Sequence, residues 1–370
     1  MKTNILNICA SADPTSPKTW SGTPFNIYTQ LLKNERLGIT FSSTANNNKL
    51  VQKWWMIVSK IYYNNSADRW RGVFYRYFNA RKALRMTSKS NTNYTLHTGT
   101  SDLPLYGKWT NQKHFLYCDS TFHLWSQRVK TNKAYTPKLL ADAESLDRKA
   151  YQQVAHIFPI SEYVKADLIN YYGINPNKIT VVGTGLGVIK PYMGVKNYAN
   201  GKILFAAKER FEDKGGLLVL EAFKIALEKN PTLELSIVGQ NDYTDKINLP
   251  NVKTYGFIPI EQLQAIFNES SLFLMPAENE PWGLVYLEAM ACKMPIVGLN
   301  LNSFPELSGY GKYGFGLDEK DPVKLAEIIT NAFKNPTQMA EIGAQAQSYC
   351  LETFSWENTV TKILKTIDNA

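Results

Sequence analysis

The chain has 370 residues, of which 44% are hydrophobic and 20% are charged, a composition typical of folded proteins and unlike that of disordered ones. At roughly 150 residues per domain, this length predicts two domains and excludes a single small module. The formal net charge is +9, from 41 basic and 32 acidic side chains.

The sequence carries no pattern typical of export or membrane insertion. No apolar run approaches the about eighteen residues that cross a bilayer, and residues 1–11 lack the basic and apolar regions of a signal peptide. The four cysteines are far apart and the four histidines show no metal-binding spacing. We therefore expect a cytoplasmic protein with reduced core thiols and no histidine-based metal site.

Short β-like runs alternate with helical patterns along the chain, which predicts an α/β protein with parallel sheets covered by helices. In the first half the predicted strands are 4–10, 38–43, 94–97, 115–118, 156–160 and 178–182. In the second half they are 202–206, 234–238, 252–255, 272–275 and 295–298, with helices at 216–228, 261–267 and 322–333. Glycines and prolines between residues 183 and 199 mark the break between two doubly wound halves that face each other across a cleft.

The whole net charge is accounted for by the stretch from Lys49 to Lys89, where ten basic residues accompany one acid, Asp68. The stretch is also rich in aromatic residues, and its apolar positions predict two amphipathic helices. Aromatic rings in a headgroup layer, with Lys and Arg on anionic lipid, would make residues 49–89 a peripheral membrane contact. Core aromatics with a solvated cationic rim, or a nucleic-acid surface, would use the same residue types. We expect an anionic membrane surface and no nucleic acid.

Three residues of the first half stand where ligands gather in α/β proteins. Gly22 precedes a helix predicted at 24–32 and would let the backbone approach a ligand, although an ordinary tight turn would also use glycine. Asp119 and His97 each end a predicted strand, and the carboxyl ends of parallel strands form the ligand-binding edge. Either side chain could equally cap a loop.

The most informative segment is 275–292, in which a strand is followed by a polar turn and a helix. Pro281 stands where the first turn of that helix would begin. The helix N-terminus would then present the amides of Trp282, Gly283 and Leu284, which suits a phosphate group.

Two glutamates flank this predicted helix start. Glu288 lies one turn beyond Leu284 on the same face, among apolar neighbours, so its carboxylate needs hydrogen-bond donors such as the hydroxyls of a ribose. Glu280 would point into the same cleft. The segment is therefore suited to a sugar nucleotide, although Glu280 on the helix dipole and Glu288 on a nearby cation would be purely structural.

Glu280 and Glu288 reproduce the E-x7-E signature of the family-4 retaining glycosyltransferases, in the form E-P-[FW]-G-L-V-x-L-E-A-M-A, and the chain resembles that family. The resemblance continues through Phe304-Pro-Glu-Leu and Gly314-Phe-Gly-Leu, covering residues 150–370 well and the first 150 weakly. It implies the GT-B fold. Residues 1–186 would bind the acceptor, 187–352 the nucleotide sugar, and 353–370 would form a helix that packs back on the first domain.

The resemblance also implies roles for single residues. In this family the first glutamate, here Glu280, contacts the donor sugar, the following amides of Gly283 and Leu284 bind the distal phosphate, and the second glutamate, Glu288, binds ribose. The family often has a hydrogen-bonding side chain near His97 as well.

The family further places an arginine and a lysine against the diphosphate. Lys214 matches the lysine, and Arg210 is the expected arginine, but the segment departs from the common G-R-x-x-x-x-K-G form, so Lys208 could replace Arg210. Two fixed cations would neutralise a leaving diphosphate, whereas the alternative is a solvated charged loop. The predicted catalytic set is Glu280, Arg210, Lys214, Asp119 and His97.

No D-x-D sequence supplies the carboxylate pair that would hold a divalent ion on a diphosphate. We therefore expect no metal and no cofactor, with a UDP- or GDP-sugar as substrate. The missing dedicated nucleophile agrees with the family's retaining route, in which the leaving phosphate assists attack on the same face of the sugar.

The predicted function is transfer of a hexose-type sugar to a hydroxyl of a membrane-associated glycan, polysaccharide or oligosaccharide, at the inner face of the cytoplasmic membrane. One alternative is transfer to a soluble saccharide. Another is a sugar-nucleotide isomerase or phosphorolytic enzyme on the same fold, and a third is a membrane- or nucleic-acid-binding protein with a vestigial donor site.

Overall fold

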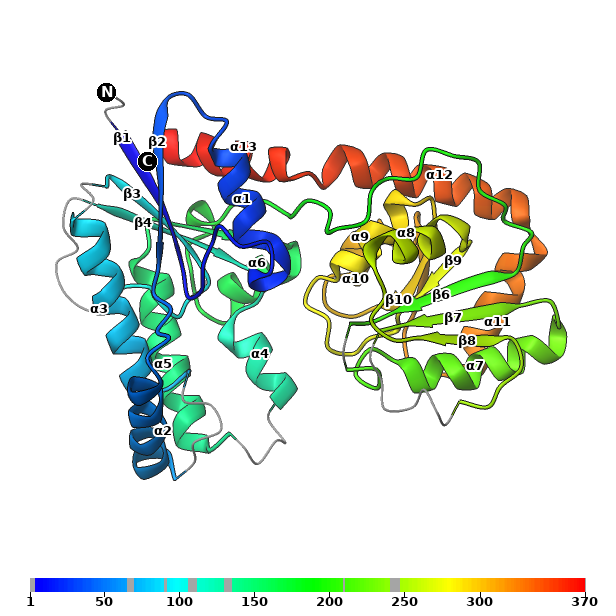
Figure 1. The fold of residues 1–370 in the computed structure, drawn as a ribbon, viewed down its shortest axis with the longest axis horizontal. Helices are drawn as coiled ribbons and strands as arrows, with labels where there is room; N and C mark the ends of the chain where they lie inside the picture. The colour runs from blue at the N-terminus through cyan, green and yellow to red at the C-terminus, as the bar shows by residue number, and fades with distance from the viewer. Residues whose placement is uncertain are drawn as a thin grey trace. The chain divides into compact units, whose positions relative to one another are not determined.

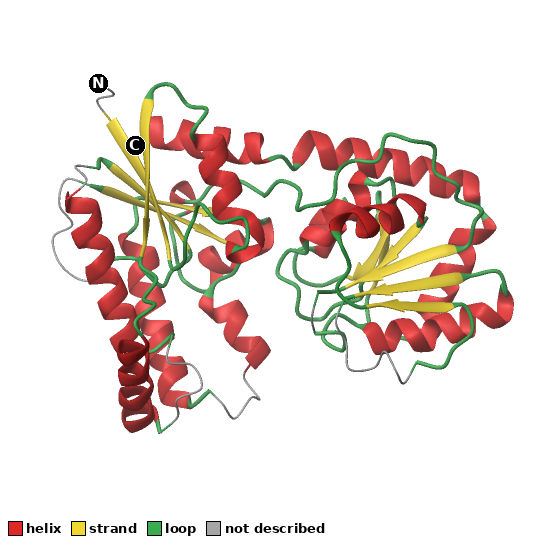
Figure 2. Ribbon diagram, viewed as in Figure 1, coloured by secondary structure: helices red, strands yellow, loops and turns green. Residues whose placement is uncertain are grey.

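The computed structural model describes residues 4–64, 70–89, 92–105, 112–129, 135–208, 210–239 and 247–369. The chain divides into two compact units, which we call the first unit (Met1–Gly185 with Trp356–Ala370) and the second unit (Leu186–Ser355). Each unit is built on a parallel sheet with helices packed against it (Figures 1 and 2). The expected α/β class with two parallel sheets is therefore confirmed.

In the first unit five described strands pair in the order β2-β1-β3-β4-β5, all parallel. The winding direction reverses between β1 and β3, so ligands are expected outside the carboxyl ends of these strands. The elements of this unit are β1 (Asn4–Ala10), η1 (Thr19–Gly22), α1 (Thr23–Leu31), β2 (Leu37–Ser43), α2 (Lys49–Tyr63), α3 (Val73–Lys89), β3 (Tyr94–Thr98), β4 (Lys113–Cys118), α4 (Phe122–Val129), α5 (Pro137–Gln153), β5 (His156–Pro159), α6 (Glu162–Asn170), η2 (Pro176–Lys178) and α13 (Trp356–Asp368).

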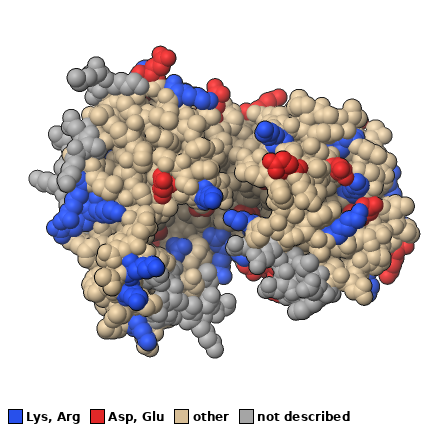
Figure 3. Space-filling model, in the orientation of Figure 1, with Lys and Arg blue, Asp and Glu red and all other residues tan. Residues whose placement is uncertain are grey.

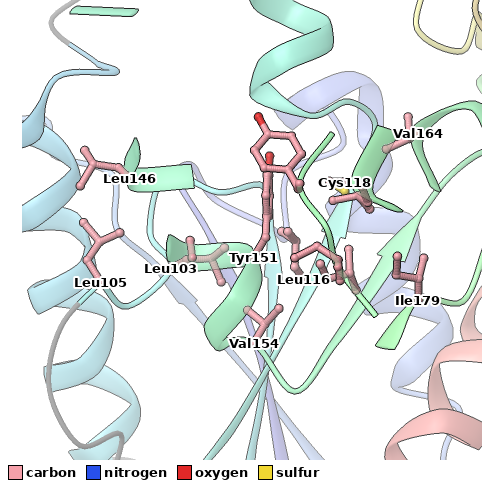
Figure 4. Packing of buried hydrophobic residues seen from close by; sticks show 14 of the residues in the cluster. Leu103, Leu105, Leu116, Cys118, Leu146, Tyr151, Val154, Val164 and Ile179 are labelled. Atoms are coloured by element: carbon pink, nitrogen blue, oxygen red, sulfur yellow. The ribbon is translucent and has the colours of Figure 1, made fainter. Parts of the chain in front are cut away.

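A largely apolar core packs against one face of this sheet. Leu116 and Cys118, alternate residues of β4, face Tyr151 of α5 and Val154, the residue that ends this helix (Figure 4). Period-two alternation along the strand and helical spacing along α5 bring these side chains to one interface, where burial stabilises the unit. The four cysteines of the chain are all buried and free, as expected.

The C-terminal helix belongs to the first unit. α13 packs on α1 (Figure 1), and Thr359 donates a hydrogen bond of 3.3 Å to the carbonyl of Val182. At its start the ring of Trp356 lies directly over Gly185, where a side chain would collide with it. The chain therefore passes through the second unit and returns to the first.

In the second unit six described strands pair in the order β11-β10-β9-β6-β7-β8, again all parallel. The winding reverses between β6 and β9, the place where a Rossmann-type sheet binds its ligand. The elements are β6 (Lys202–Ala206), α7 (Gly216–Lys229), β7 (Glu234–Val238), β8 (Val252–Tyr255), α8 (Ile260–Glu269), β9 (Leu272–Leu274), α9 (Leu284–Ala291), β10 (Ile296–Leu299), α10 (Phe304–Leu307), β11 (Gly314–Leu317), α11 (Pro322–Lys334) and α12 (Pro336–Thr353).

Two strand predictions need correction. Residues 178–182 were expected to form a strand, but the segment begins in the short helix η2 and makes only an isolated bridge, between Ile179 and Ile157. It runs beside β5 through backbone hydrogen bonds donated by Thr180 and Val182, without forming a ladder. β11 was not predicted as a strand, because Gly314 and Gly316 lower its β-propensity.

The two helices predicted within residues 49–89 are α2 and α3. Asn48 caps α2, since its side chain accepts from the amides of Leu50 and Val51. In the part of the chain that the structure describes, no helix combines the length and the apolar character needed to cross a membrane.

Candidate active site

Two loops meet at the reversal point of the second sheet. One follows β6 and carries Lys214, and the other follows β9 and carries Glu280, so residues far apart in the sequence meet because their strands are neighbours. The ammonium of Lys214 forms an ion pair with the carboxylate of Glu280, and both side chains are mostly buried. Gly215, with φ of +84°, lets the first loop pass directly against the carbonyl of Pro276 in the second.

α9 begins at Leu284, three residues later than the position predicted from Pro281. Gly283 has a left-handed φ of +86°, which is incompatible with the helix and makes it the N-cap residue. Trp282 is buried, with its ring 5.5 Å from that of Phe354, so this residue offers its backbone and not its side chain at the surface of the turn. Its amide lies 3.4 Å from Oε1 of Glu280. The amides of Gly283 and Leu284 stand at the positive end of the α9 dipole.

Glu288 is buried on α9, and main-chain amides hold its carboxylate. Oε1 accepts hydrogen bonds of 2.7 Å from Val188 and 3.2 Å from Ile189. Burial raises the pKa of Glu288 above its usual value, and the two amides partly offset that rise. Among the described residues none donates to Oε2, so this oxygen keeps its full accepting capacity.

The two remaining cations of the donor set are exposed. Arg210 has a left-handed φ of +65°, unusual for a residue other than glycine, and its Nε donates to Asp213 at 2.8 Å. Lys208 is exposed two residues earlier. The structure therefore joins Lys214 to Glu280 and leaves Arg210 and Lys208 in the same loop with solvent-facing side chains.

In the first unit, Gly22 lies in a strained turn after β1. Trp20, Ser21 and Gly22 are three consecutive left-handed residues, and Gly22 caps α1. Left-handed Trp and Ser cost free energy that the surrounding structure must offset, a property often found at functional sites. The ring of Trp20 lies 5.9 Å from Tyr117 of β4, which ties this turn to the neighbouring strand ends.

Asp119 follows β4 at the same carboxyl edge of the sheet and is half-buried. Burial raises the pKa of Tyr117 and of Cys118, and the negative charge of Asp119 raises both further. Asp119 and Gly22 thus lie at the edge where the sequence predicts ligand contact.

His97 is fully buried and lies in a polar cluster inside the sheet. Its Nδ1 is 3.3 Å from Asp102, its Nε2 is 2.9 Å from Nδ1 of His114, and Cys9 donates to Asp102 at 3.0 Å. Burial, and then the neighbouring His97, lower the pKa of His114 to about 3. Cys9, His97 and Asp102 bring three atoms of metal-ligating type within 4.8 Å of one another, although hydrogen bonds already link them. Both ring nitrogens of His97 are therefore engaged by the protein.

Sequence reasoning missed the residues that hold the site in shape. Gly187 leaves room for the Glu288 carboxylate, which a side chain there would strike. From the loop after β10, Asn302 donates to the carbonyl of Glu278 at 2.9 Å and Ser303 to that of Pro281 at 2.5 Å. The glycine-rich break at 183–199 and the Phe304 motif were the available signals, and neither specified these contacts.

The family described as "Glycosyl transferases group 1" matches residues 194–349. The D-inositol 3-phosphate glycosyltransferase of Corynebacterium efficiens is 23% identical over 225 residues, which cover 54% of this chain and 52% of that protein. The alpha-maltose-1-phosphate synthase of Mycolicibacterium smegmatis is 29% identical over 114 residues, covering 29% of this chain and 30% of that protein. The chain thus spans about half, or less, of the length of these curated relatives.

Solved structures match the whole chain. Sucrose-phosphate synthase from Thermosynechococcus elongatus gives a TM-score of 0.71 at 15% identity and covers 99% of both chains. HepE from Anabaena, in complex with UDP-glucose, gives a TM-score of 0.69 at 13% identity and covers 99% of this chain and 100% of that one. At such identities the likeness shows the fold, which is GT-B. The match to the group 1 glycosyl transferases lies within the second unit, at residues 194–349.

Proposed function

We propose that the protein is a metal-independent, retaining glycosyltransferase that moves a hexose-type sugar from a nucleoside diphosphate to an acceptor hydroxyl. The observation that carries this proposal is the pairing of Lys214 with Glu280 beside the N-terminus of α9, with Glu288 one turn along that helix. Glu280, then Lys214 with the α9 N-terminus, then Glu288 would correspond to the sugar, the diphosphate and the ribose of a sugar nucleotide.

The diphosphate would lie between Lys214 and the amides of Gly283 and Leu284. A helix N-terminus attracts anions, and a partly buried ammonium adds a charge-assisted hydrogen bond. In the ligand-free chain Lys214 is neutralised by Glu280. A phosphate would take over the ammonium, and the released Glu280 carboxylate could accept hydrogen bonds from the sugar hydroxyls.

The ribose would be read by Glu288. Its Oε1 is fixed by the amides of Val188 and Ile189, so the carboxyl group is oriented before any ligand arrives. Oε2 would then accept hydrogen bonds from the ribose hydroxyls. This requires that Oε2 of the buried acid carries no proton.

In the transfer step the bond between the anomeric carbon and the phosphate oxygen breaks, and the acceptor oxygen forms a bond to that carbon on the same face. The acceptor proton goes to the departing diphosphate. Lys214, Arg210 or Lys208, and the α9 amides stabilise the growing negative charge. Asp119 and His97 stay candidates on the acceptor side, with His97 acting through Asp102 or His114 because its ring is buried.

The donor is a UDP- or GDP-sugar, and the UDP-glucose complex of HepE supports testing UDP-glucose first. We further propose an acceptor on a membrane-associated glycan, polysaccharide or oligosaccharide, with the protein on the inner face of the cytoplasmic membrane. Residues 1–186 would bind this acceptor and 187–352 the donor, with 353–370 completing the first domain.

The test is release of nucleoside diphosphate from UDP-, GDP- and ADP-sugars, with and without chelator. We expect slow hydrolysis of one donor, insensitive to chelator and lost in Glu280→Ala. The matched control is Glu278→Ala, because this exposed carboxylate in the same loop pairs with Lys320 at 2.9 Å, away from Lys214. Full activity of Glu280→Ala would contradict the site, and a chelator-sensitive reaction would contradict metal independence.

Product analysis separates the rival reactions. Formation of an isomer of the sugar nucleotide would indicate an isomerase instead of a transferase. Formation of a sugar phosphate only when inorganic phosphate is added would indicate a phosphorolytic enzyme. If the protein binds a donor but turns it over with none of the acceptors in lipid or saccharide extracts, the donor site would be vestigial.

A further inference from the structure

The outward face of α2 carries a continuous apolar stripe. Its members are four and three residues apart, which places them on one side of a helix, and all are solvent-exposed: Leu50 (75%), Trp54 (44%), Ile57 (55%) and Ile61 (79%). The opposite face, with Trp55, Ser59 and Tyr63, is buried against the first unit. We call these four exposed residues the α2 stripe. Exposed apolar patches of this kind usually mark an interaction site.

α3 continues the surface on one side of the stripe. The rings of Trp54 and Phe78 meet edge to face at 5.7 Å, and Tyr77 and Phe78 are exposed. Arg81 and Arg85 are exposed at helical spacing from them. Aromatic and aliphatic side chains therefore form one surface across both helices, with arginines beside the rings.

The charge on this surface has one sign. Lys49, Lys53 and Lys60 line the other side of the stripe, and Figure 3 shows Lys and Arg over the region where α2 and α3 lie. No acid occurs in residues 49–64 or 70–89, the described part of this stretch.

Other cations of the stretch have structural partners and do not belong to the surface. Arg76 forms a buried ion pair with Asp147, Lys82 donates to the carbonyl of Ala45 at 2.7 Å, and Arg71 lies 3.4 Å over the ring of Trp125. The stretch thus combines two of the roles that its sequence suggests. Some of its cations support the fold, and five exposed ones, Lys49, Lys53, Lys60, Arg81 and Arg85, surround the stripe.

We propose that the α2 stripe and its five cations form a docking surface for an anionic lipid bilayer, with α2 lying in the plane of the headgroups. Tryptophan and aliphatic side chains on one helix face, bordered by Lys and Arg, are typical of helices that lie in the membrane interface. Anionic headgroups complement a surface that carries no acid in its described part, and the acyl region accepts Leu50, Ile57 and Ile61.

Two other occupants fit the surface less well. A second copy of the chain in a symmetric dimer would bring like-charged sets of cations together, which is unfavourable. Single-stranded nucleic acid would stack on Trp54, Tyr77 and Phe78, but three of the four stripe residues are aliphatic and offer no ring for a base.

The position of α2 connects docking to the proposed function. Five residues separate the end of β2 from the start of α2, so α2 leaves the sheet from the carboxyl edge that also carries Gly22 and Asp119. A bilayer on α2 would bring lipid headgroups toward this edge. Bilayer binding rests on the surface alone, whereas the further step to a lipid-linked acceptor rests on the proposed function.

Vesicle co-sedimentation of the full chain tests the docking surface. We expect binding to phosphatidylcholine vesicles that contain phosphatidylglycerol, weakened by salt, and little binding to phosphatidylcholine alone. Ile57→Ser with Ile61→Ser should lose at least about tenfold in affinity, because two exposed apolar side chains that would enter the acyl region are removed. Lys53→Gln with Lys60→Gln should lose about fivefold for each cation.

The matched control is Val195→Ser with Val323→Ser, which removes two exposed apolar residues of the second unit. All variants change exposed positions, so their Tm should equal that of the wild type. Wild type that ignores phosphatidylglycerol, or stripe variants that bind as well as the control, would overturn the proposal. So would a wild-type dimer abolished by Ile61→Ser, or binding to single-stranded DNA that outcompetes vesicles.

Binding is measured without donor, and nucleoside diphosphate release is measured without vesicles. The docking surface can therefore fail while the transferase stands, and the transferase can fail while docking stands.

Discussion

The two sheets differ in where the polar residues near the carboxyl ends of their strands lie. In the second unit, Lys214 and Glu280 meet across neighbouring strand ends, and Glu288 is held by two main-chain amides. In the first unit, His97 near the end of β3 is enclosed with Asp102, His114 and Cys9. The second unit presents its polar groups at the edge, and the first unit keeps part of them inside.

This difference indicates how the work would be divided. A site for a nucleotide sugar needs fixed charges, and fixing them requires close backbone approach at Gly187, Gly215 and Gly283. The first unit instead has a strained turn at Gly22 and an internal hydrogen-bond cluster within its sheet. We infer that the proposed donor binding depends on individual side chains of the second unit. The enclosed cluster of the first unit contributes mainly to stability and would affect the reaction only through His97.

The largest expected effect is that of Lys214→Ala. Removal of a preorganised cation from a developing diphosphate should lower turnover about 10²- to 10³-fold. It also leaves Glu280 partly buried without its ion-pair partner. The measurement is nucleoside diphosphate release at saturating donor. Lys224→Ala, which changes an exposed lysine on α7, is the control, and a Lys214→Ala enzyme as active as this control would contradict the assignment.

Glu288→Gln and Glu288→Ala separate ligand binding from structure. Gln keeps an oxygen for the amides of Val188 and Ile189 but loses the charged acceptor, so turnover should fall about 10- to 100-fold while stability is retained. Ala also leaves the two amides without an acceptor and should lower the free energy of unfolding by about 1–3 kcal/mol. Kinetics and urea denaturation measure the two effects. Equal stability of both variants would show that the amides do not depend on Glu288.

The pH dependence of Glu288 has a defined sign. Its folded pKa is raised above 4.5, so the folded state binds the proton more tightly than the unfolded state. Its contribution to stability is therefore largest below pH 4.5 and is lost as the pH rises through the raised pKa. Glu288→Gln, which cannot titrate, should lack this loss when unfolding is followed between pH 4 and 8.

The turn and helix start that carry the proposed donor-side residues could be predicted from the sequence, because helix caps, glycine turns and the glutamate spacing are local patterns. The pairing of Lys214 with Glu280 could not, since it depends on β6 and β9 being neighbours, which is a matter of topology. The contacts of His97 could not be predicted from the sequence either. Its place at a strand end was predictable, but the partners that enclose it come from β1, β4 and the loop at Asp102. The start of α9 was misplaced because Pro281 fits a first helical turn as well as the tight turn that precedes Gly283.

The buried cluster of the first unit should affect stability before activity. Asp102→Ala removes the acceptor of both Cys9 and His97 and should cost about 1–3 kcal/mol for each donor left unpaired. Thermal unfolding measures this loss, and Glu327→Ala, which removes an exposed carboxylate of α11, is the comparison. If His97→Ala kept full stability and lost turnover, His97 would have a role in the reaction that its burial does not suggest.

Acid titration extends this test. The pKa of His114 is lowered to about 3, so the unfolded state binds a proton between pH 6.5 and about 3 that the folded state does not. Stability from this group is present above pH 6.5 and is lost as the pH falls through that window. His114→Gln should therefore be less acid-sensitive than the wild type in reversible denaturation.

The smallest effect expected is that of the exposed cations, and it decides between Arg210 and Lys208. Two unit charges about 4 Å apart near a protein surface interact far more weakly than buried ones, and Asp213 already neutralises part of the Arg210 charge. Arg210→Ala should lower turnover about three- to tenfold, with Lys208→Ala smaller. Asp213→Ala should shift the apparent donor affinity upward, because it releases the guanidinium for phosphate. A larger loss in Lys208→Ala, with Asp213→Ala neutral, would instead make Lys208 the second cation on the diphosphate and leave the left-handed Arg210 as a feature of the turn that leads into α7.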